Sequence, residues 1–370
     1  MFRYAETKKN GRVAVVLVLM VFLFMACFAN TAFADVYGGG SSPAPTPEPT
    51  PITQTVKTDD DKAIDEALRE TGAAVVAGKA AVQLSAGTVS TLTSSGTALS
   101  VSNEGATLNF GAQSLNTQTL QNAQGNDNAT VNIGVRQVTG TEKDNLISNA
   151  TAAGSGLIAI GTGNVNMVFE FKAEVTTTNT DGTTSTQSIG DFSEPVLVVI
   201  DLSNVQLTAE EIAQLSAVRM GTNQALGGTY DPVTQTFSFY TTNFSLYTVM
   251  KKPDLVNLTL TVGSKETLMN GKSKAIDVPP TIIQNRTMVP LRYIGEAFGA
   301  TFAWNEATRT VTYTYKGKTL KLVIDVPSAG MDVAATIRDG RTLVPIRYCS
   351  ESFGAEVMWF PSTRKVTVVK

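Results

Sequence analysis

The sequence predicts a mainly β protein with short helices, made of a β-sandwich-like middle region and a duplicated α+β module near its C-terminal end. Three observations predict this fold class. Apolar and polar residues alternate with a period of two through much of the middle region. Turn signals such as Asp181-Gly182 separate these runs. A segment of 19 residues that begins at Arg286 recurs, with substitutions, from Arg341, which indicates internal duplication.

Residues 1–34 have the pattern of a signal peptide. Basic residues precede the apolar run 13–28, and Ala32-Phe33-Ala34 is a small-residue cleavage site. We therefore expect a secreted chain that begins near Asp35. An uncleaved membrane anchor is the alternative, although the run is shorter than the ~20 apolar residues of a typical span. A lipoprotein anchored through Cys27 fits less well, since Leu is missing three residues before it.

Residues 35–58 are expected to form a linker. Gly and Ser give this stretch flexibility, and its spaced prolines favour extended polyproline II segments. The linker either holds the folded part away from a surface or is a disordered tail without a spacing role. A short helix is expected next, because Ile64 and Leu68 lie four residues apart, acidic residues precede them and Gly72 follows. The acidic run Asp59–Asp61 lacks the spaced ligands of a calcium loop and is interpreted as a helix start.

Residues 59–253 are expected to form an acidic β-rich module. In the segment 165–175, Val165, Phe169 and Phe171 lie on one face and Glu170 and Lys172 on the other, as in a half-buried strand. Short strands separated by turn signals continue to residue 250 and predict a β-sandwich. The segments 82–115 and 227–250 resemble a β module of Gram-positive surface-layer and cell-wall proteins. That resemblance implies a spacer or scaffold.

Residues 254–370 contain two repeats, at about 276–313 and 331–368, related by an offset of 55 residues. In each repeat a Pro fits the first turn of a short helix and a Gly follows its end. The helix of the first copy has Leu291, Ile294 and Phe298 on one face. Cys349 takes the place of Ile294 in the second copy, so we interpret it as a small buried hydrophobe rather than a nucleophile. The chain then becomes extended, which predicts a helix packed on a small antiparallel sheet.

The segments 285–313 and 340–369 closely resemble the copper amine oxidase-like N-terminal domain, also called the stalk domain. The resemblance implies a non-catalytic extracellular module. In the full oxidase, three histidines hold copper and a tyrosine in an Asn-Tyr-Asp/Glu context becomes the quinone cofactor. This sequence has no histidine and no Asn-Tyr pair. We therefore expect no copper, other metal or cofactor, and no enzyme activity that depends on histidine.

Charge is distributed unevenly along the chain. Residues 35–253 contain 10 Lys and Arg against 21 Asp and Glu, a net charge of −11, whereas residues 254–370 contain 15 against 10, a net charge of +5. We therefore expect an exported, non-catalytic cell-envelope protein whose basic module attaches to peptidoglycan or anionic glycopolymers of a Gram-positive wall. The β module would act as a spacer. The chain carries no sortase-type Leu-Pro-x-Thr-Gly signal, so wall retention is expected to be non-covalent or through an uncleaved signal.

The candidate glycan- or phosphate-binding residues are Arg292, Tyr293, Arg347 and Tyr348, because aromatic rings beside arginines suit such ligands. The alternative is that both arginines form helix ion pairs with the glutamates four residues later and that the tyrosines pack on the sheet.

Two other functions remain open. The chain could be a surface-layer or coat protein that acts by protein–protein assembly. It could also be a wall hydrolase that uses paired carboxylates, for which Asp191, Glu194 and Asp201 are the nearest cluster in the sequence. An exported acidic chain is not expected to bind nucleic acid, and no membrane contact is expected beyond an uncleaved signal.

Overall fold

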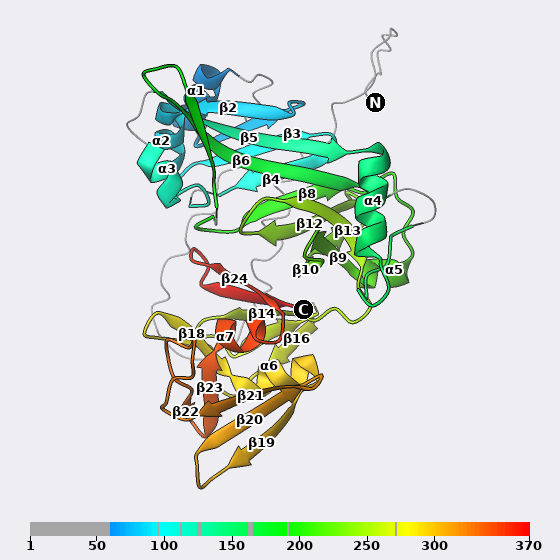
Figure 1. Cartoon of the computed structure of the whole chain (residues 1–370), viewed down its shortest axis with the longest axis vertical. Coiled ribbons are helices and arrows are strands. Elements are labelled where there is room, and N and C mark those ends of the chain that lie inside the picture. The colour runs from blue at the N-terminus through cyan, green and yellow to red at the C-terminus, as the bar shows by residue number, and fades with distance from the viewer. Residues whose placement is uncertain are drawn as a thin grey trace, which may run out of the picture. The chain divides into compact units, whose positions relative to one another are not determined.

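The computed structural model describes residues 60–94, 96–111, 113–123, 128–161, 166–190, 192–270 and 272–370. The predicted signal peptide and linker lie outside these residues, as do Asp59, Val165 and Asp191. All described residues belong to one compact unit, Gln54–Lys370. The fold is mainly β with short helices, as predicted (Figure 1). No helix among the described residues has the length and apolar character needed to cross a membrane.

The region up to residue 253 contains two sheets. The first has the strand order β1-β3-β4-β8-β12-β11, and only its β1–β3 pair is parallel. Its strands are β1 (Ala73–Ala77), β3 (Ala98–Asn103), β4 (Ala106–Phe110), β8 (Val196–Asp201), β11 (Thr229–Asp231) and β12 (Thr236–Thr241). The second has the order β10-β9-β13-β6-β5-β2, with β7 also paired to β6. Its strands are β2 (Ala81–Ser85), β5 (Ala129–Val138), β6 (Val168–Thr178), β7 (Thr184–Ser188), β9 (Leu215–Arg219), β10 (Gln224–Gly227) and β13 (Leu246–Lys251).

The two sheets share one hydrophobic core, as expected of a sandwich. Val101 and Leu108 of the first sheet and Ile133 and Phe171 of the second belong to the same buried cluster. The burial of β6 alternates along most of the strand, which is the pattern that the period of two predicted. The helices of this region are α1 (Asp61–Thr71), α2 (Ala86–Ser94), α3 (Gln118–Ala123), α4 (Gly140–Ala150) and α5 (Ala209–Ala213).

Helix α1 confirms the predicted short helix and explains its acidic start. The Asp60 carboxylate accepts a hydrogen bond from the Lys62 amide at 3.1 Å and caps the first turn. Gly72 ends the helix with a φ of 73°, in the left-handed region where Gly is favoured. Ile64 and Leu68 point into the core and are fully buried.

The region from residue 254 onward is built from three small antiparallel sheets and two helices. The strand orders are β16-β15-β14-β25-β24, β17-β18-β23-β22 and β19-β20-β21. The first sheet contains β14 (Asn257–Thr261), β15 (Glu266–Met269), β16 (Lys272–Ala275), β24 (Glu356–Phe360) and β25 (Lys365–Val369). The second contains β17 (Thr281–Ile283), β18 (Arg286–Pro290), β22 (Thr336–Arg338) and β23 (Arg341–Pro345), and the third β19 (Thr301–Asn305), β20 (Thr310–Tyr315) and β21 (Lys318–Val323). The helices are α6 (Leu291–Phe298) and α7 (Ile346–Glu351).

The two repeats meet as a locally twofold-symmetric pair. Strands β18 and β23 are equivalent by the 55-residue offset, and they pair antiparallel with Val289 opposite Val344, its own equivalent. On either side of this central pair, Met288 lies opposite Pro345 and Pro290 opposite Leu343. A register in which a residue faces its own copy is the signature of a twofold axis through that point. The duplication thus builds one module with one shared core rather than two separate ones.

The ends of the repeats complete each other's sheets. Strand β14, which precedes the first repeat, pairs with β25, the last strand of the second, with Asn257 opposite Val369. Strand β21, which precedes the second repeat, pairs with β20, the last strand of the first, with Tyr315 opposite Lys318. Each repeat therefore supplies a strand to its partner's sheet.

The predicted helices form, but both begin one residue later than expected, and α7 ends at Glu351 with Ser352 as its C-cap, before the expected Gly354. Pro290 and Pro345 end their strands and occupy the N-cap positions, so the helices start at Leu291 and Ile346. The ring fixes the φ of Pro290 at −59° at the point where the chain leaves the sheet.

The helix–sheet contact of the first repeat needs a glycine. A Cβ added at Gly295 would lie 2.0 Å from the tip of the Phe302 ring, which stacks on Tyr313 at 5.3 Å between ring centroids. In the second repeat the equivalent residues are Ser350 and Val357, and both are buried.

Candidate functional site

Arg292, the first of the candidate arginines, lies exposed on α6. No ion pair to it is formed among the residues that the structure describes. Glu296, four residues further on, instead lies 3.8 Å from the Nζ of Lys274. The alternative interpretation of Arg292 as half of a helix ion pair is therefore wrong, and its guanidinium faces solvent.

Tyr293 does not lie on the surface, which corrects its choice as a contact residue. Its side chain is 5% exposed and belongs to the core that the two repeats share. Burial raises the pKa of its phenol, and the Lys274 Nζ lies 5.7 Å from the ring centroid. The ring packs inside the module because α6 buries a face wider than the one that Leu291, Ile294 and Phe298 define.

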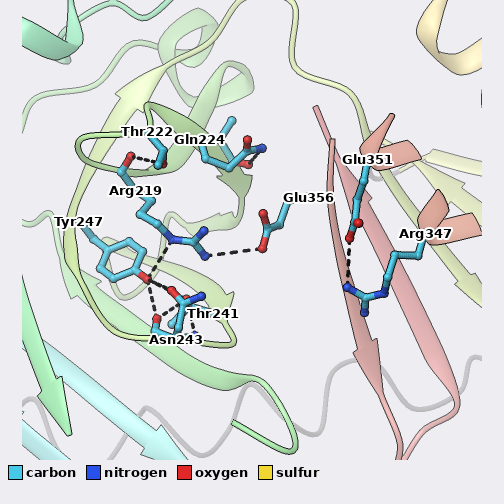
Figure 2. A network of polar contacts seen from close by, with 10 residues as sticks. Arg219, Thr222, Gln224, Thr241, Asn243, Tyr247, Arg347, Glu351 and Glu356 are labelled. Atoms are coloured by element: carbon cyan, nitrogen blue, oxygen red, sulfur yellow. Dashed lines mark hydrogen bonds and ion pairs between the residues drawn. The ribbon is translucent and has the colours of Figure 1, made fainter. Parts of the chain in front are cut away.

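Arg347 and Tyr348 on α7 lie differently from their copies. The Arg347 guanidinium is exposed and donates a hydrogen bond to Glu351 at 3.0 Å, the helix pair that the alternative interpretation expected (Figure 2). Tyr348 is half-buried, and its hydroxyl donates to the Ala329 carbonyl at 3.2 Å. Of the four candidates, Arg292, Arg347 and the edge of Tyr348 are accessible.

Two ion pairs join the repeats, and the sequence reasoning missed them. The Nε of Arg286 donates to Asp332 at 3.0 Å, and the Nε of Arg341 donates to Asp277 at 2.9 Å. Each pair links one repeat to the other, and the two pairs are equivalent by the 55-residue offset. The signal was present in the sequence, because the Asp and the Arg recur together in both copies.

A second missed feature is a group of four lysines, Lys252, Lys316, Lys318 and Lys370, which we call the lysine cluster. The Lys370 Nζ lies 5.0 Å from the centroid of Tyr315, and the Lys316 Nζ lies 5.5 Å from the same ring. The Lys252 and Lys316 ammoniums lie 2.7 Å and 3.7 Å from the carboxylate of Asp254. Burial and the charges of the other three lysines lower the pKa of Lys370.

Polar and apolar contacts join the β-sandwich region to the second repeat. Arg219 of β9 lies 3.5 Å from Glu356 of β24, and its Nε lies 3.4 Å from the hydroxyl of Tyr247 (Figure 2). The Tyr247 hydroxyl in turn donates to the Asn243 carbonyl at 2.5 Å. Beside this network a small apolar cluster contains Ala225, Met358 and Val369, with Tyr240 and Phe360 packed against it.

Glu194 and Asp201, the two proposed hydrolase carboxylates that the structure describes, do not form a site with each other. Glu194 accepts hydrogen bonds from Ser362, and Asp201 accepts one from the Ser203 amide at 2.8 Å. The two acids flank β8, a separation of roughly 20 Å along an extended strand, whereas glycosidase carboxylates lie about 5–10 Å apart. Within the described ranges, no group of three or more Cys, Asp or Glu side chains could hold a metal ion. Cys349 is fully buried, and burial raises the pKa of its thiol.

Two of the cavities among the described residues are shallow and open. One, of about 370 Å³, is lined by the loop Thr151–Ile158 together with Pro253 and Asp254. The other, of about 420 Å³, is lined by residues of β2 and β5 and by Asp61.

The C-terminal region is thus a module of helices laid on small sheets, duplicated about a local twofold axis. Residues 245–313 and 323–370 match the model of the copper amine oxidase N-terminal domain family. The match covers the oxidase's non-catalytic domain and not its catalytic one. It supports the resemblance seen in the sequence for this part of the chain. No curated protein matches the sequence significantly.

Proposed function

We propose that this chain is an exported, non-catalytic cell-envelope protein whose C-terminal module holds anionic polymers of the cell wall. The observation that carries the proposal is the module's unneutralised positive charge. Six of its 15 Lys and Arg residues form ion pairs, and nine have no ion-pair partner among the described residues. These nine are Lys265, Lys272, Arg292, Lys318, Lys321, Arg338, Arg364, Lys365 and Lys370.

Most acidic residues of the module already form ion pairs within the protein. Seven of its 10 Asp and Glu residues are in ion pairs, Glu356 with Arg219 of the sandwich and the other six within the region from residue 254. The excess charge is therefore basic and solvent-facing. Such a surface attracts polyanions with an affinity that falls as salt rises, because ions screen exposed charges over about 10 Å at 0.1 M.

The residues proposed to contact the polymer are Arg292, Arg347 and Tyr348. The arginines occupy equivalent positions on α6 and α7, and both guanidiniums are exposed. Arg347 forms an ion pair with Glu351, so Arg292 is the more available of the two arginines for an anionic ligand. Tyr293 is not included, since its ring lies in the core.

The β-sandwich region is proposed to act as a spacer. Its polar contact between Arg219 and Glu356 and the apolar cluster around Met358 support a firm attachment to the basic module. Its own net charge of −11, counted from residue 35, would keep it away from an anionic wall.

The test is retention of the whole chain on purified Gram-positive walls, before and after extraction of their anionic polymers, across a salt series. We expect retention at low salt, loss of retention at about 0.5 M salt, and loss after extraction. The double variant Arg292→Gln/Arg347→Gln should elute at lower salt than the parent. Arg136→Gln, an exposed arginine of the sandwich region, is the matched control and should elute with the parent.

Protein that stays in the supernatant of intact walls at low salt contradicts wall attachment. That result would favour the second candidate function, assembly with coat proteins. One observation favours it: Ile282 and Ile337 hold equivalent positions on the outer strands β17 and β22 and are 40% and 44% exposed. Self-association in sedimentation velocity that Ile282→Lys abolishes would support that candidate.

A further inference from the structure

We propose that the lysine cluster, Lys252, Lys316, Lys318 and Lys370 around Tyr315, is a binding site for a phosphate-bearing polymer. The inference rests on the proposed function and adds a second contact region to the arginines of α6 and α7. It follows from where the two repeats end, from the charges that meet there and from the kind of cation present.

The fold brings these lysines together from distant parts of the sequence. Lys316 and Lys318 lie at the tight turn between β20 and β21. Lys370 follows β25, the equivalent of β20, and pairs through its backbone with Val256 just before β14. The offset of 55 residues makes Lys370 the copy of Tyr315. The strand ends of both repeats therefore converge, with Lys252 on the segment that leads into β14.

The charges at this point do not cancel. Asp254 is the side-chain carboxylate that contacts the cluster, through Lys252 and Lys316, so the four ammoniums outnumber the carboxylate side chain paired with them. The Lys370 Nζ is held in place by the Phe353 carbonyl and lies over the rings of Tyr315 and Phe298, at 5.0 Å and 6.0 Å from their centroids. The lowered pKa of Lys370, for which burial and the three neighbouring lysines are responsible, agrees with an uncompensated cluster. A bound anion would relieve this repulsion.

The cluster consists of lysines alone, which suits phosphate groups bound by charge. Lysine ammoniums bind phosphate groups as point charges and do not need the planar, bidentate geometry with which arginine binds carboxylates and phosphates alike. The site is open, since Lys316 and Asp254 are 69% and 61% exposed. An open site with several separate cations suits an extended chain of phosphates better than a single enclosed phosphate ion.

Lys316 offers a variant that separates binding from folding. Lys316 and Gly317 form a two-residue turn with φ values of 45° and 79°. Such a turn with two positive φ values favours Asn-Gly, so Lys316→Asn should leave the module as stable or make it more stable while it removes one charge. Lys318→Gln removes a second charge from an exposed side chain. Lys370 is left in place because it also holds the Phe353 carbonyl.

The experiment measures binding of the whole chain to inorganic polyphosphate by titration calorimetry at low salt, and to poly-glutamate of similar length. We expect polyphosphate to bind more tightly than poly-glutamate. The variant Lys316→Asn/Lys318→Gln should bind polyphosphate about thirtyfold more weakly, from about 1 kcal/mol per lysine near an anionic surface. The matched control, Lys272→Gln/Arg338→Gln, removes the same charge from exposed sites that do not affect the pKa of Lys370. The affinity of this control variant for polyphosphate should fall by less than about threefold.

Three outcomes overturn the inference: equal losses in the two double variants, a preference for poly-glutamate, or no binding of polyphosphate. Retention of the parent and the cluster variant on purified walls tests the proposed function separately from the binding of polyphosphate. If the cluster variant is retained on walls like the parent, the lysine cluster is not the site, although wall attachment stands. If polyphosphate binds at the cluster but walls retain nothing, the site stands and wall attachment fails.

Discussion

Gly295 and Phe302 show how single residues adjust one copy of the repeat against the other. The Phe302 ring fills the space that a side chain at residue 295 would need. In the second copy the equivalent residues are Ser350 and Val357, and both are buried. The identities at these two positions are therefore coupled, and reading either residue alone would miss the reason for the other.

We predict that Gly295→Ser destabilises the module by about 1 kcal/mol, the low end of the cost of overpacking, because the new side chain meets the outer end of the Phe302 ring, which is 36% exposed and can shift. Adding Phe302→Val should recover most of that loss, because the pair then matches Ser350 and Val357 of the second repeat. Urea unfolding followed by tryptophan fluorescence measures this, since Trp304 and Trp359 are the only tryptophans in the chain and both lie in the module. A double variant no more stable than Gly295→Ser would show that the two positions are independent.

At the residue scale, the sequence predicted burial better than contact. Cys349 was expected to be a buried hydrophobe because it replaces Ile294, and it is fully buried. The surroundings of the Arg-Tyr pairs were harder to predict, because neighbouring residues on a short helix can face different surroundings in the two copies. Tyr293 enters the core whereas Tyr348 stays half-buried, a difference that depends on the tertiary packing around each helix.

Among the elements, α5 is held at its start by a capping box. The Thr208 hydroxyl accepts from the Glu211 amide at 3.2 Å, and the Glu211 carboxylate accepts from the Thr208 amide at 3.0 Å. Glu211 also pairs with Lys251 of β13 at 3.0 Å, so one carboxylate joins the helix to a strand. The hydrogen bond from the Thr208 amide and the ion pair with the Lys251 ammonium lower the pKa of Glu211 from 4.5 to about 2.

This shift predicts a defined loss of stability in acid. Between pH 4.5 and about 2, the unfolded chain binds a proton at Glu211 that the folded chain does not, so stability falls as the pH is lowered. The thermal midpoint of the parent should exceed that of Glu211→Gln above pH 5, and the difference should vanish near pH 2. Midpoints measured every half pH unit test this. Curves that stay parallel to pH 2 would exclude the carboxylate as the cause.

At the scale of elements, the sequence predicted what local pattern controls. The alternation that defines β6 and the Gly and acidic signals that bound α1 both act within a few residues, and both elements formed as expected. The starts of α6 and α7 were placed one residue early, because Pro suits the N-cap position as well as the first turn.

For the whole molecule, the central result is the twofold arrangement of the repeats. The paired strands β18 and β23 put Val289 opposite Val344, and the ion pairs Arg286–Asp332 and Arg341–Asp277 cross between the copies on either side. The duplication was evident in the sequence, but the pairing was not, since periodicity within a segment contains no information about which distant strand it joins. The lysine cluster was missed for the same reason.

The symmetry makes the two cross-repeat ion pairs energetically equivalent. We predict that Asp332→Asn and Asp277→Asn each lower the free energy of unfolding of the module by about 0.5–1 kcal/mol, the range for exposed pairs of this kind. The double variant should show the sum to within about 0.5 kcal/mol, because the two pairs share no residue. Urea titrations of the three variants measure these values. A large loss for one aspartate and none for the other would contradict the equivalence.

The exchange of strands at the repeat ends has a consequence for how the chain can be cut and rejoined. The backbones of Lys370 and Val256 pair at 2.8 and 2.9 Å, in the place where Tyr315 and Lys318 are joined by a two-residue turn. A short turn could therefore connect 370 to 256, and the chain could be opened between Lys316 and Gly317 instead. Such a circular permutant of the module would keep every strand neighbour it has now. The same closure means that an added third repeat would find both edges of β25 already occupied.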